Sequence, residues 1–182
     1  MKKLTQGDQF PSFTFNTHKR DQLNSSDVLK GKTVFWVLRY IGCTVCRYDV
    51  HLIASRYQEF IDKNAQVFVV MQSDREHVIN DLKNTNTELP FEIICDNDQK
   101  IYDMLCIEAA QSGEELLGSR GDDLKAKGAA ARAAGFAHGD YEGNELQLPA
   151  MFIVEENGTV CYAHYAADIM DMPKVDDVLK ML

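Results

Sequence analysis

Two cysteines separated by two residues are the part of this sequence with the clearest chemistry. Cys43 and Cys46 stand just after an apolar run that ends at Tyr40, at the start of a segment with helical spacing. A helix N-terminus presents unpaired N–H groups and a partial positive charge, which stabilise a thiolate and lower the pKa of a thiol. Sulfurs spaced by one helical turn can exchange between dithiol and disulfide. The sequence therefore predicts thiol redox chemistry at this pair.

Charged and polar residues around the pair support the same chemistry. Arg39 and Arg47 add positive charge within a few residues of both cysteines, and Thr44 lies between them. A cation close to a thiol favours the thiolate and so lowers the pKa of the thiol. We therefore take Arg39, Thr44 and Arg47 as supporting residues of a catalytic pair.

Zinc binding is the main alternative for two cysteines with this spacing. Tetrahedral zinc needs four ligands, and a second close pair usually supplies the other two. His51 lies nearby, but it is more simply interpreted as a solvated surface residue. The remaining cysteines are widely scattered: Cys95, Cys106 and Cys161. We therefore favour a redox pair over structural zinc, and we expect neither a metal nor a bound organic cofactor.

The scattered cysteines have simpler interpretations. Cys95 ends one apolar run and Cys161 lies in a later one, and a buried free cysteine behaves as a small hydrophobic residue. Cys106 follows Met104 and Leu105 at the end of a predicted helix. It is also a candidate for a mobile resolving cysteine, and the sequence leaves that role open.

Length, charge and composition exclude several classes of protein. The chain has 182 residues, 45% of them hydrophobic and 26% charged, which fits one globular domain. Its net charge of −9 argues against nucleic acid and anionic membrane surfaces, because both attract clustered Lys and Arg. The longest apolar run, residues 33–38, is too short to span a bilayer. The first residues lack the apolar run of a secretory signal, so we expect a cytoplasmic protein.

Six segments have the pattern of β-strands. They are residues 13–15, 32–40, 65–71, 90–95, 151–154 and 159–165. The longer ones are almost continuously apolar, which is typical of strands buried on both faces. Asn157-Gly158 between the last two is a strong hairpin signal.

Helical patterns separate these strands. After Gly42, apolar residues such as Val50 and Ile53 recur on one stripe. Ser73 is the predicted N-cap of the next helix, with Asp74 in the first turn. Further helices are expected at residues 99–106, within about 107–147, and after Pro173. Strand–helix–strand–helix, then a hairpin and a last helix, predicts an α/β sandwich around a mixed sheet.

Four motifs extend over nearly the whole chain. They are Gly7-Asp8-Gln9-Phe10-Pro11-Ser12-Phe13, Leu29-Lys30-Gly31-Lys32, the Cys43–Cys46 turn, and Leu148-Pro149-Ala150-Met151-Phe152-Ile153-Val154 before Asn157-Gly158. In order and spacing they resemble the thioredoxin-fold redoxins of the alkyl hydroperoxide reductase C/thiol-specific antioxidant (AhpC/TSA) family. The resemblance implies one thioredoxin-like three-layer sandwich over residues 1–182, a central mixed β-sheet with flanking helices and a helical insertion at about 107–147. It also implies that Pro149 is a cis-proline facing the cysteine turn.

The resemblance leaves the roles of the two cysteines open. In a thioredoxin-like cycle Cys43, expected to be the more exposed, attacks a disulfide and Cys46 resolves the mixed disulfide. In a peroxiredoxin-like cycle Cys46 forms a sulfenic acid and Cys43 condenses with it. That family typically places Pro seven residues before its reactive cysteine and Thr or Ser three before; counted from Cys46, Arg39 and Cys43 stand there. The family's second arginine is replaced around Pro149, so we expect peroxide to react more slowly than disulfides.

We therefore predict a thiol-dependent oxidoreductase that cycles Cys43–Cys46 between dithiol and disulfide. Its substrates would be disulfides or peroxides, an antioxidant activity, and its reductant a thioredoxin-type protein or a low-molecular-weight thiol. A homodimer is a further candidate arrangement. The alternative from another class is a non-catalytic redox-sensing or binding module on the same fold, in which oxidation changes partner affinity without consuming substrate.

Overall fold

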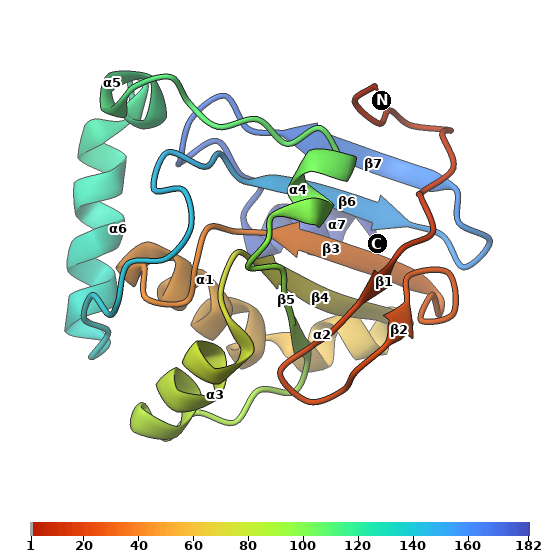
Figure 1. Ribbon diagram of the computed structural model, residues 1–182, viewed down its shortest axis with the longest axis horizontal. Helices are drawn as coiled ribbons and strands as arrows, with labels where there is room; N and C mark the ends of the chain where they lie inside the picture. The colour runs from red at the N-terminus through yellow and green to blue at the C-terminus, as the bar shows by residue number, and fades with distance from the viewer. Residues whose placement is uncertain (1) are drawn as a thin grey trace.

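The computed structural model describes residues 2–182 and is built on a five-stranded sheet (Figure 1). Its strands are β3 (Lys32–Val37), β4 (Ala65–Met71), β5 (Glu92–Cys95), β6 (Ala150–Val154) and β7 (Val160–Tyr165). They are arranged in the order β5-β4-β3-β6-β7. β3, β4 and β5 run parallel, whereas β6 is antiparallel to both β3 and β7. The predicted mixed sheet and C-terminal hairpin are confirmed.

The sheet separates two apolar cores. Along β3, Val34 and Trp36 point into one core, and Phe35 and Val37 point into the other, as alternation along a strand requires. All four side chains are buried. A strand with apolar neighbours on both faces carries an unbroken apolar run, and this explains the pattern seen in the sequence.

Helices cover both faces of the sheet and give the fold its three layers. One face carries α1 (Thr44–Ser55), α2 (Tyr57–Asp62), α3 (Arg75–Asn84) and α7 (Val175–Met181). The other face carries α4 (Lys100–Met104) and a small hairpin of β1 (Thr14–Phe15) and β2 (Leu23–Asn24). None of the helices within residues 2–182 combines the length and apolar character needed to cross a bilayer.

The junction between β4 and α3 differs from the prediction by one residue. Asp74, not Ser73, is the N-cap of α3, and its carboxylate accepts the N–H of Glu76 at 2.8 Å. Ser73 is buried, and its Oγ accepts the N–H of Ile41 at 2.8 Å. A hydroxyl and a neighbouring carboxylate are both good caps, so local preference could not separate them. A tertiary contact decided the choice by taking the serine hydroxyl.

The chain between α4 and β6 contains the segment for which a helical insertion is predicted. It contains α5 (Gly113–Leu117) and α6 (Gly121–Ala133), with α6 beside α1 at one side of the molecule (Figure 1). Lys127 of α6 pairs with Asp49 of α1 at 2.6 Å, and both side chains are largely buried. After α6 the chain passes over the start of α1, where the Gly139 N–H donates to the Gly42 carbonyl at 2.7 Å. The insertion thus brings a distant segment onto the cysteine turn.

Candidate active site

The cysteine turn lies between the end of β3 and the start of α1. Cys43 is the N-cap of α1 and Cys46 lies in the first turn of that helix. The bond from the Ile41 N–H to Ser73 Oγ ties the turn to the chain that follows β4. Because β3 and β4 are parallel, their carboxyl ends meet at one edge of the sheet. The structure therefore places both predicted cysteines where the sequence put them, at the N-terminus of a helix.

Both cysteines are covered. The exposed fraction is 2% for Cys43 and 4% for Cys46, so the prediction that Cys43 is the more exposed is wrong. That expectation rested on depth along the helix alone. The chain around Gly139 packs on the end of α1 and removes the difference. Position within a helix determines burial only where nothing else covers the helix end.

The two thiols have opposite pKa shifts. A hydrogen bond from the Cys46 thiol and the charge of Arg39 lower the pKa of Cys43 to about 5, against the effect of burial. The Nη2 atom of Arg39 lies 3.1 Å from the Cys43 Sγ. The same bond to Cys43, together with burial, raises the pKa of Cys46 well above its ordinary value. At neutral pH the pair is a thiolate at Cys43 and a thiol at Cys46.

Arg39 is held over the dithiol from three sides. Its Nη2 donates to Cys43, and its Nη1 donates to the Glu145 carbonyl at 2.6 Å. The guanidinium carbon lies 5.5 Å from the centre of the Tyr40 ring, a cation–π distance. The Nε atom is buried and has no hydrogen-bond partner within residues 2–182. One donor of the guanidinium is therefore unused beside the thiolate.

Tyr40 connects Arg39 to the loop that follows α6. Its hydroxyl lies 3.3 Å from Nε2 of His138, and Nδ1 of His138 lies 2.7 Å from the Gly139 carbonyl. A carbonyl only accepts, so Nδ1 carries the proton and Nε2 accepts from the tyrosine hydroxyl. Burial raises the pKa of Tyr40 to about 12, which keeps that hydroxyl protonated. The side chain that packs on Arg39 is thus fixed in place by the loop.

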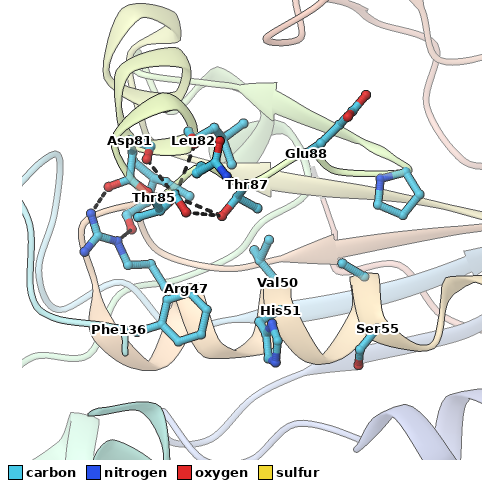
Figure 2. A pocket seen from close by; sticks show the side chains of 14 residues that line it. Arg47, Val50, His51, Ser55, Asp81, Leu82, Thr85, Thr87, Glu88 and Phe136 are labelled. Carbon is cyan, nitrogen blue, oxygen red and sulfur yellow. Dashed lines mark hydrogen bonds and ion pairs between the residues drawn. The ribbon is translucent and has the colours of Figure 1, made fainter. Parts of the chain in front are cut away.

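The other two supporting residues, Arg47 and Thr44, have their main contacts away from the sulfurs. Arg47 turns toward α3, where it pairs with Asp81 (Figure 2), and it donates to the Ile41 carbonyl at 2.9 Å and to the Ala137 carbonyl. Thr44 is the first residue of α1 and is half-buried. Within residues 2–182, neither side chain forms a hydrogen bond to a cysteine sulfur. Arg47 serves as an anchor between three segments.

Pro149 lies at the expected edge of the sheet, but not in the expected conformation. None of the peptide bonds within residues 2–182 is cis, so the prediction of a cis Leu148–Pro149 bond is wrong. The Pro149 carbonyl accepts the Ala166 N–H at 3.1 Å, and β6 begins at the next residue. Pro149 therefore immediately precedes a strand, a position at which proline is tolerated. Ala150 pairs with Val37, at the end of β3 from which the cysteine turn departs.

A segment that the sequence analysis did not assign to the site packs on the residues around the dithiol. Residues 137–145, called the strap below, supply the carbonyls of Ala137 and Glu145 and the ring of His138 described above. Its glycines, Gly139 and Gly143, and its position after a predicted helix were the available signals. Neither signal indicates which surface a loop will contact, because the partners lie far away in the sequence.

The remaining cysteines lie on other elements of the fold than the pair. Cys95 ends β5, Cys161 lies in β7, and Cys106 follows α4, on the sheet face opposite to α1. All five cysteines of the chain are free thiols. Within residues 2–182, no three His, Cys, Asp or Glu side chains are grouped so that they could hold a metal ion.

A mixed sheet whose first long strand leads into a dithiol at a helix N-terminus defines the class of thioredoxin-fold redoxins. Within that class, the sequence profile of the AhpC/TSA family matches residues 6–163. The chain belongs to the AhpC/TSA family and is a thiol-dependent oxidoreductase. No curated protein sequence matches the chain significantly.

Solved peroxiredoxin structures share this fold. A yeast mitochondrial 1-Cys peroxiredoxin is 15% identical with a TM-score of 0.69, over 97% of this chain and 73% of its own. A peroxiredoxin-like protein from Aquifex aeolicus is 15% identical with a TM-score of 0.64, over 99% and 86%. The 2-Cys peroxiredoxin of Plasmodium vivax is 12% identical with a TM-score of 0.68, over 96% and 78%. At these identities the likeness is one of fold.

Proposed function

We propose that this oxidoreductase reduces peroxides, with the Cys43 thiolate as the attacking group and Cys46 as the resolving thiol. The observation that carries the proposal is the contact of 3.1 Å between Arg39 Nη2 and Cys43 Sγ. It joins a thiol whose pKa is lowered to about 5 to a buried cation. Thiolates, not thiols, are the nucleophiles in this chemistry, so Cys43 is reactive at neutral pH.

The first step of the cycle transfers one peroxide oxygen to Cys43. The thiolate sulfur attacks that oxygen, an S–O bond forms and the O–O bond breaks. The leaving alkoxide or hydroxide takes a proton and departs as an alcohol or water, and Cys43 becomes a sulfenic acid. The Cys46 thiol then attacks the sulfenic sulfur, a disulfide forms and water leaves. Two equivalents of an external thiol return the disulfide to the dithiol and are themselves oxidised to a disulfide.

Arg39 provides the charge stabilisation that the sequence analysis found missing. Negative charge develops on the leaving oxygen, and donors already aimed at that point lower the barrier. The guanidinium is held by the Glu145 carbonyl and the Tyr40 ring, so it need not reorganise during the reaction. Its unused Nε–H is a donor that the leaving oxygen can accept from. The sequence alone predicts a slow reaction with peroxide; with Arg39 at the sulfur, we propose a reaction that the guanidinium accelerates.

The proposal includes a redox-active Cys43–Cys46 disulfide and an external thiol reductant. A thioredoxin-type protein and a low-molecular-weight thiol are the two candidates. The thiol-resolving mechanism of the structurally similar yeast 1-Cys peroxiredoxin works via glutathione/thioredoxin systems. The five free cysteines support a reducing setting such as the cytoplasm. A homodimer stays a prediction.

Stopped-flow oxidation of the reduced protein by hydrogen peroxide tests the assignment of roles. We expect Cys46→Ser to be oxidised at a rate within a few-fold of wild type and to stop at a sulfenic acid, which dimedone traps at Cys43. We expect Cys43→Ser to lose the fast phase altogether. Trapping at Cys46 instead would reverse the roles.

The same experiment separates the other functions. Rapid oxidation by a model disulfide, together with peroxide reaction no faster than that of a free thiol of equal pKa, would make the protein a disulfide reductase. Stoichiometric oxidation without turnover under any thiol reductant would favour the redox-sensing module.

A further inference from the structure

The strap is fastened to the junction of β4 and α3 by polar contacts, some of them partly buried. The Glu142 side chain is 8% exposed; its carboxylate accepts the Asp74 N–H at 2.9 Å and pairs with His77 at 2.6 Å. The Asn144 backbone and the Gln72 side-chain amide exchange two hydrogen bonds of 2.7 and 3.0 Å. These contacts hold the strap without help from Cys43 or Arg39.

Glycines allow the strap to lie directly on the cysteine turn. A Cβ added at Gly42 would come within 2.0 Å of the Asp140 carbonyl oxygen. One at Gly139 would come within 2.7 Å of Arg47 Nη2 and 3.2 Å of the Gly42 Cα. At Gly143, where φ is +61°, a Cβ would lie 2.6 Å from the Gln72 side chain. The strap backbone therefore packs directly on Gly42, the residue before Cys43, with the Arg47 guanidinium against Gly139.

Two surface grooves lie next to the strap, and neither reaches the sulfurs. One of about 380 Å³ lies between α1 and α3 (Figure 2), and the other, of about 440 Å³, lies between α3 and the strap. Arg47 and Asp81 line both grooves, and Gly42 lines the second. Neither cysteine lines either groove. With the strap in place, neither groove gives access to the dithiol from the side of α3.

We propose that the strap makes the site selective for oxidants of the size of hydrogen peroxide and excludes bulky hydroperoxides and disulfides from Cys43. The inference rests on the proposed role of Cys43 as the attacking thiolate. Hydrogen peroxide has two heavy atoms and reaches the sulfur through a small opening. A disulfide must place its two sulfurs in line with the attacking sulfur, with substituents beyond both, so the strap must leave the turn.

The strap is held weakly enough to open from time to time, so it restricts access to Cys43 by size and does not block it permanently. Most strap side chains are exposed and few are apolar, so opening the strap costs far less than unfolding the domain. Oxidants that need a wide opening react in proportion to the open population, whereas those that fit the closed form do not. Loosening the strap must therefore accelerate bulky oxidants selectively.

The test compares neutral oxidants, because the strap carries acidic side chains that would repel charged probes. Second-order rate constants are measured for hydrogen peroxide, cumene hydroperoxide and 2-hydroxyethyl disulfide with the reduced wild type and with Glu142→Ala. Loss of a charge-assisted hydrogen bond should raise the open population about tenfold, and the two bulky oxidants should gain by the same factor. The hydrogen peroxide rate should stay within about twofold, because Glu142 touches neither sulfur nor Arg39.

Matched controls separate loosening from general damage. Glu76→Ala removes the same charge from exposed α3 surface and should leave all three rates unchanged. If Glu142→Ala does not fold, Gly143→Ala loosens the strap at its neighbouring contact with Gln72, and Gly135→Ala is its control. Both glycines have positive φ, but a Cβ at Gly135 meets nothing within 4 Å.

The outcomes test the proposed size selectivity of the strap separately from the proposed peroxidase activity. Equal wild-type rates with hydrogen peroxide and cumene hydroperoxide, or unchanged ratios in a folded strap variant, would overturn the size selectivity and leave the peroxidase intact. A wild type that reacts with 2-hydroxyethyl disulfide and not with hydrogen peroxide would overturn the proposed function and the size selectivity together.

Discussion

The cysteine turn and the strap touch each other but are built in different ways. In the turn, the partners of Cys43 are close in the sequence: Arg39 is four residues before it, and Cys46 is three residues after it in the first turn of α1. In the strap, Glu142 contacts His77 across 65 positions and Glu145 contacts Arg39 across 106. The reactivity of the thiolate is thus a property of neighbouring residues, whereas access to it depends on distant ones.

This difference means that reactivity and access can be changed separately. Substitutions inside the turn should alter the pKa and rate constant of Cys43 for every oxidant. Substitutions in the strap or its anchors should alter which oxidants reach Cys43, and leave its pKa in place. Arg39 is the exception, because it binds both the sulfur and the strap.

Replacing Arg39 should have the largest effect, because it removes the donor from the thiolate. In Arg39→Met we expect the rate constant with hydrogen peroxide near neutral pH to fall about 100-fold, the range for loss of one preorganised donor. The pKa of Cys43, followed by thiolate absorbance, should rise toward its ordinary value. Arg39→Lys keeps the charge and should lose less. An unchanged pKa of Cys43 in Arg39→Met would show that this residue does not stabilise the thiolate.

Asp81→Asn should lower stability without changing the chemistry. Arg47 and Asp81 are 12% and 13% exposed, and removal of one partner leaves a buried charge unpaired. We expect the free energy of unfolding in urea to fall by about 3 kcal/mol, and the pKa of Cys43 to stay near about 5. Asp103→Asn, on the exposed side of α4, is the control and should change stability by less than about 0.5 kcal/mol. A large change in the pKa of Cys43 in Asp81→Asn would show that the reactivity of the cysteine turn depends on this distant ion pair.

The pH dependence of oxidation reports on the turn alone. With a pKa of about 5, Cys43 is a thiolate above that pH. The rate constant with hydrogen peroxide should therefore be flat near neutrality and fall roughly tenfold per pH unit below about pH 5. A thiol with an ordinary pKa of about 8.5 would already lose rate at neutral pH. That earlier loss would contradict the assigned thiolate.

The same pKa shift makes the free energy of unfolding depend on pH. A pKa lower in the folded than in the unfolded state stabilises the fold above the unfolded pKa, and the gain is lost as pH falls through the folded pKa. The stability of reduced wild type relative to Cys43→Ser should therefore rise with pH between about 5 and about 8.5. Urea unfolding of both proteins at several pH values measures this difference.

Tyr40→Phe should give the smallest effect and acts only on the strap. The ring stays on Arg39, and only the hydroxyl contact to His138 is lost. A neutral hydrogen bond contributes about 1 kcal/mol, so alkylation of Cys43 by iodoacetamide should speed up about fivefold. Tyr141→Phe is the control, since that residue is 66% exposed. Equal rates in Tyr40→Phe and wild type would show that this bond does not hold the strap.

Most of the fold and the reactive pair were predictable because they depend on local patterns. Apolar runs identified the strands, and Asn157-Gly158 identified the C-terminal hairpin that the structure confirms. The cysteine spacing after a buried strand identified the dithiol. The cis conformation expected at Pro149 was not a local property: the bond is trans, and the segment is hydrogen-bonded to the distant Ala166 and Glu108.

By itself, then, the sequence determined the order of elements, the α/β class and the place of a thiolate-forming pair at a helix N-terminus. Only the tertiary structure decided that Arg39 turns back to Cys43 while Arg47 turns away to Asp81, although the two are equally charged and lie on either side of the pair. It also decided that a loop after α6 packs on Arg39 and on Gly42, beside the two cysteines. The physical reason is that a charge or a loop is positioned by whichever partner packing brings within hydrogen-bond distance, and those partners are distant in the sequence.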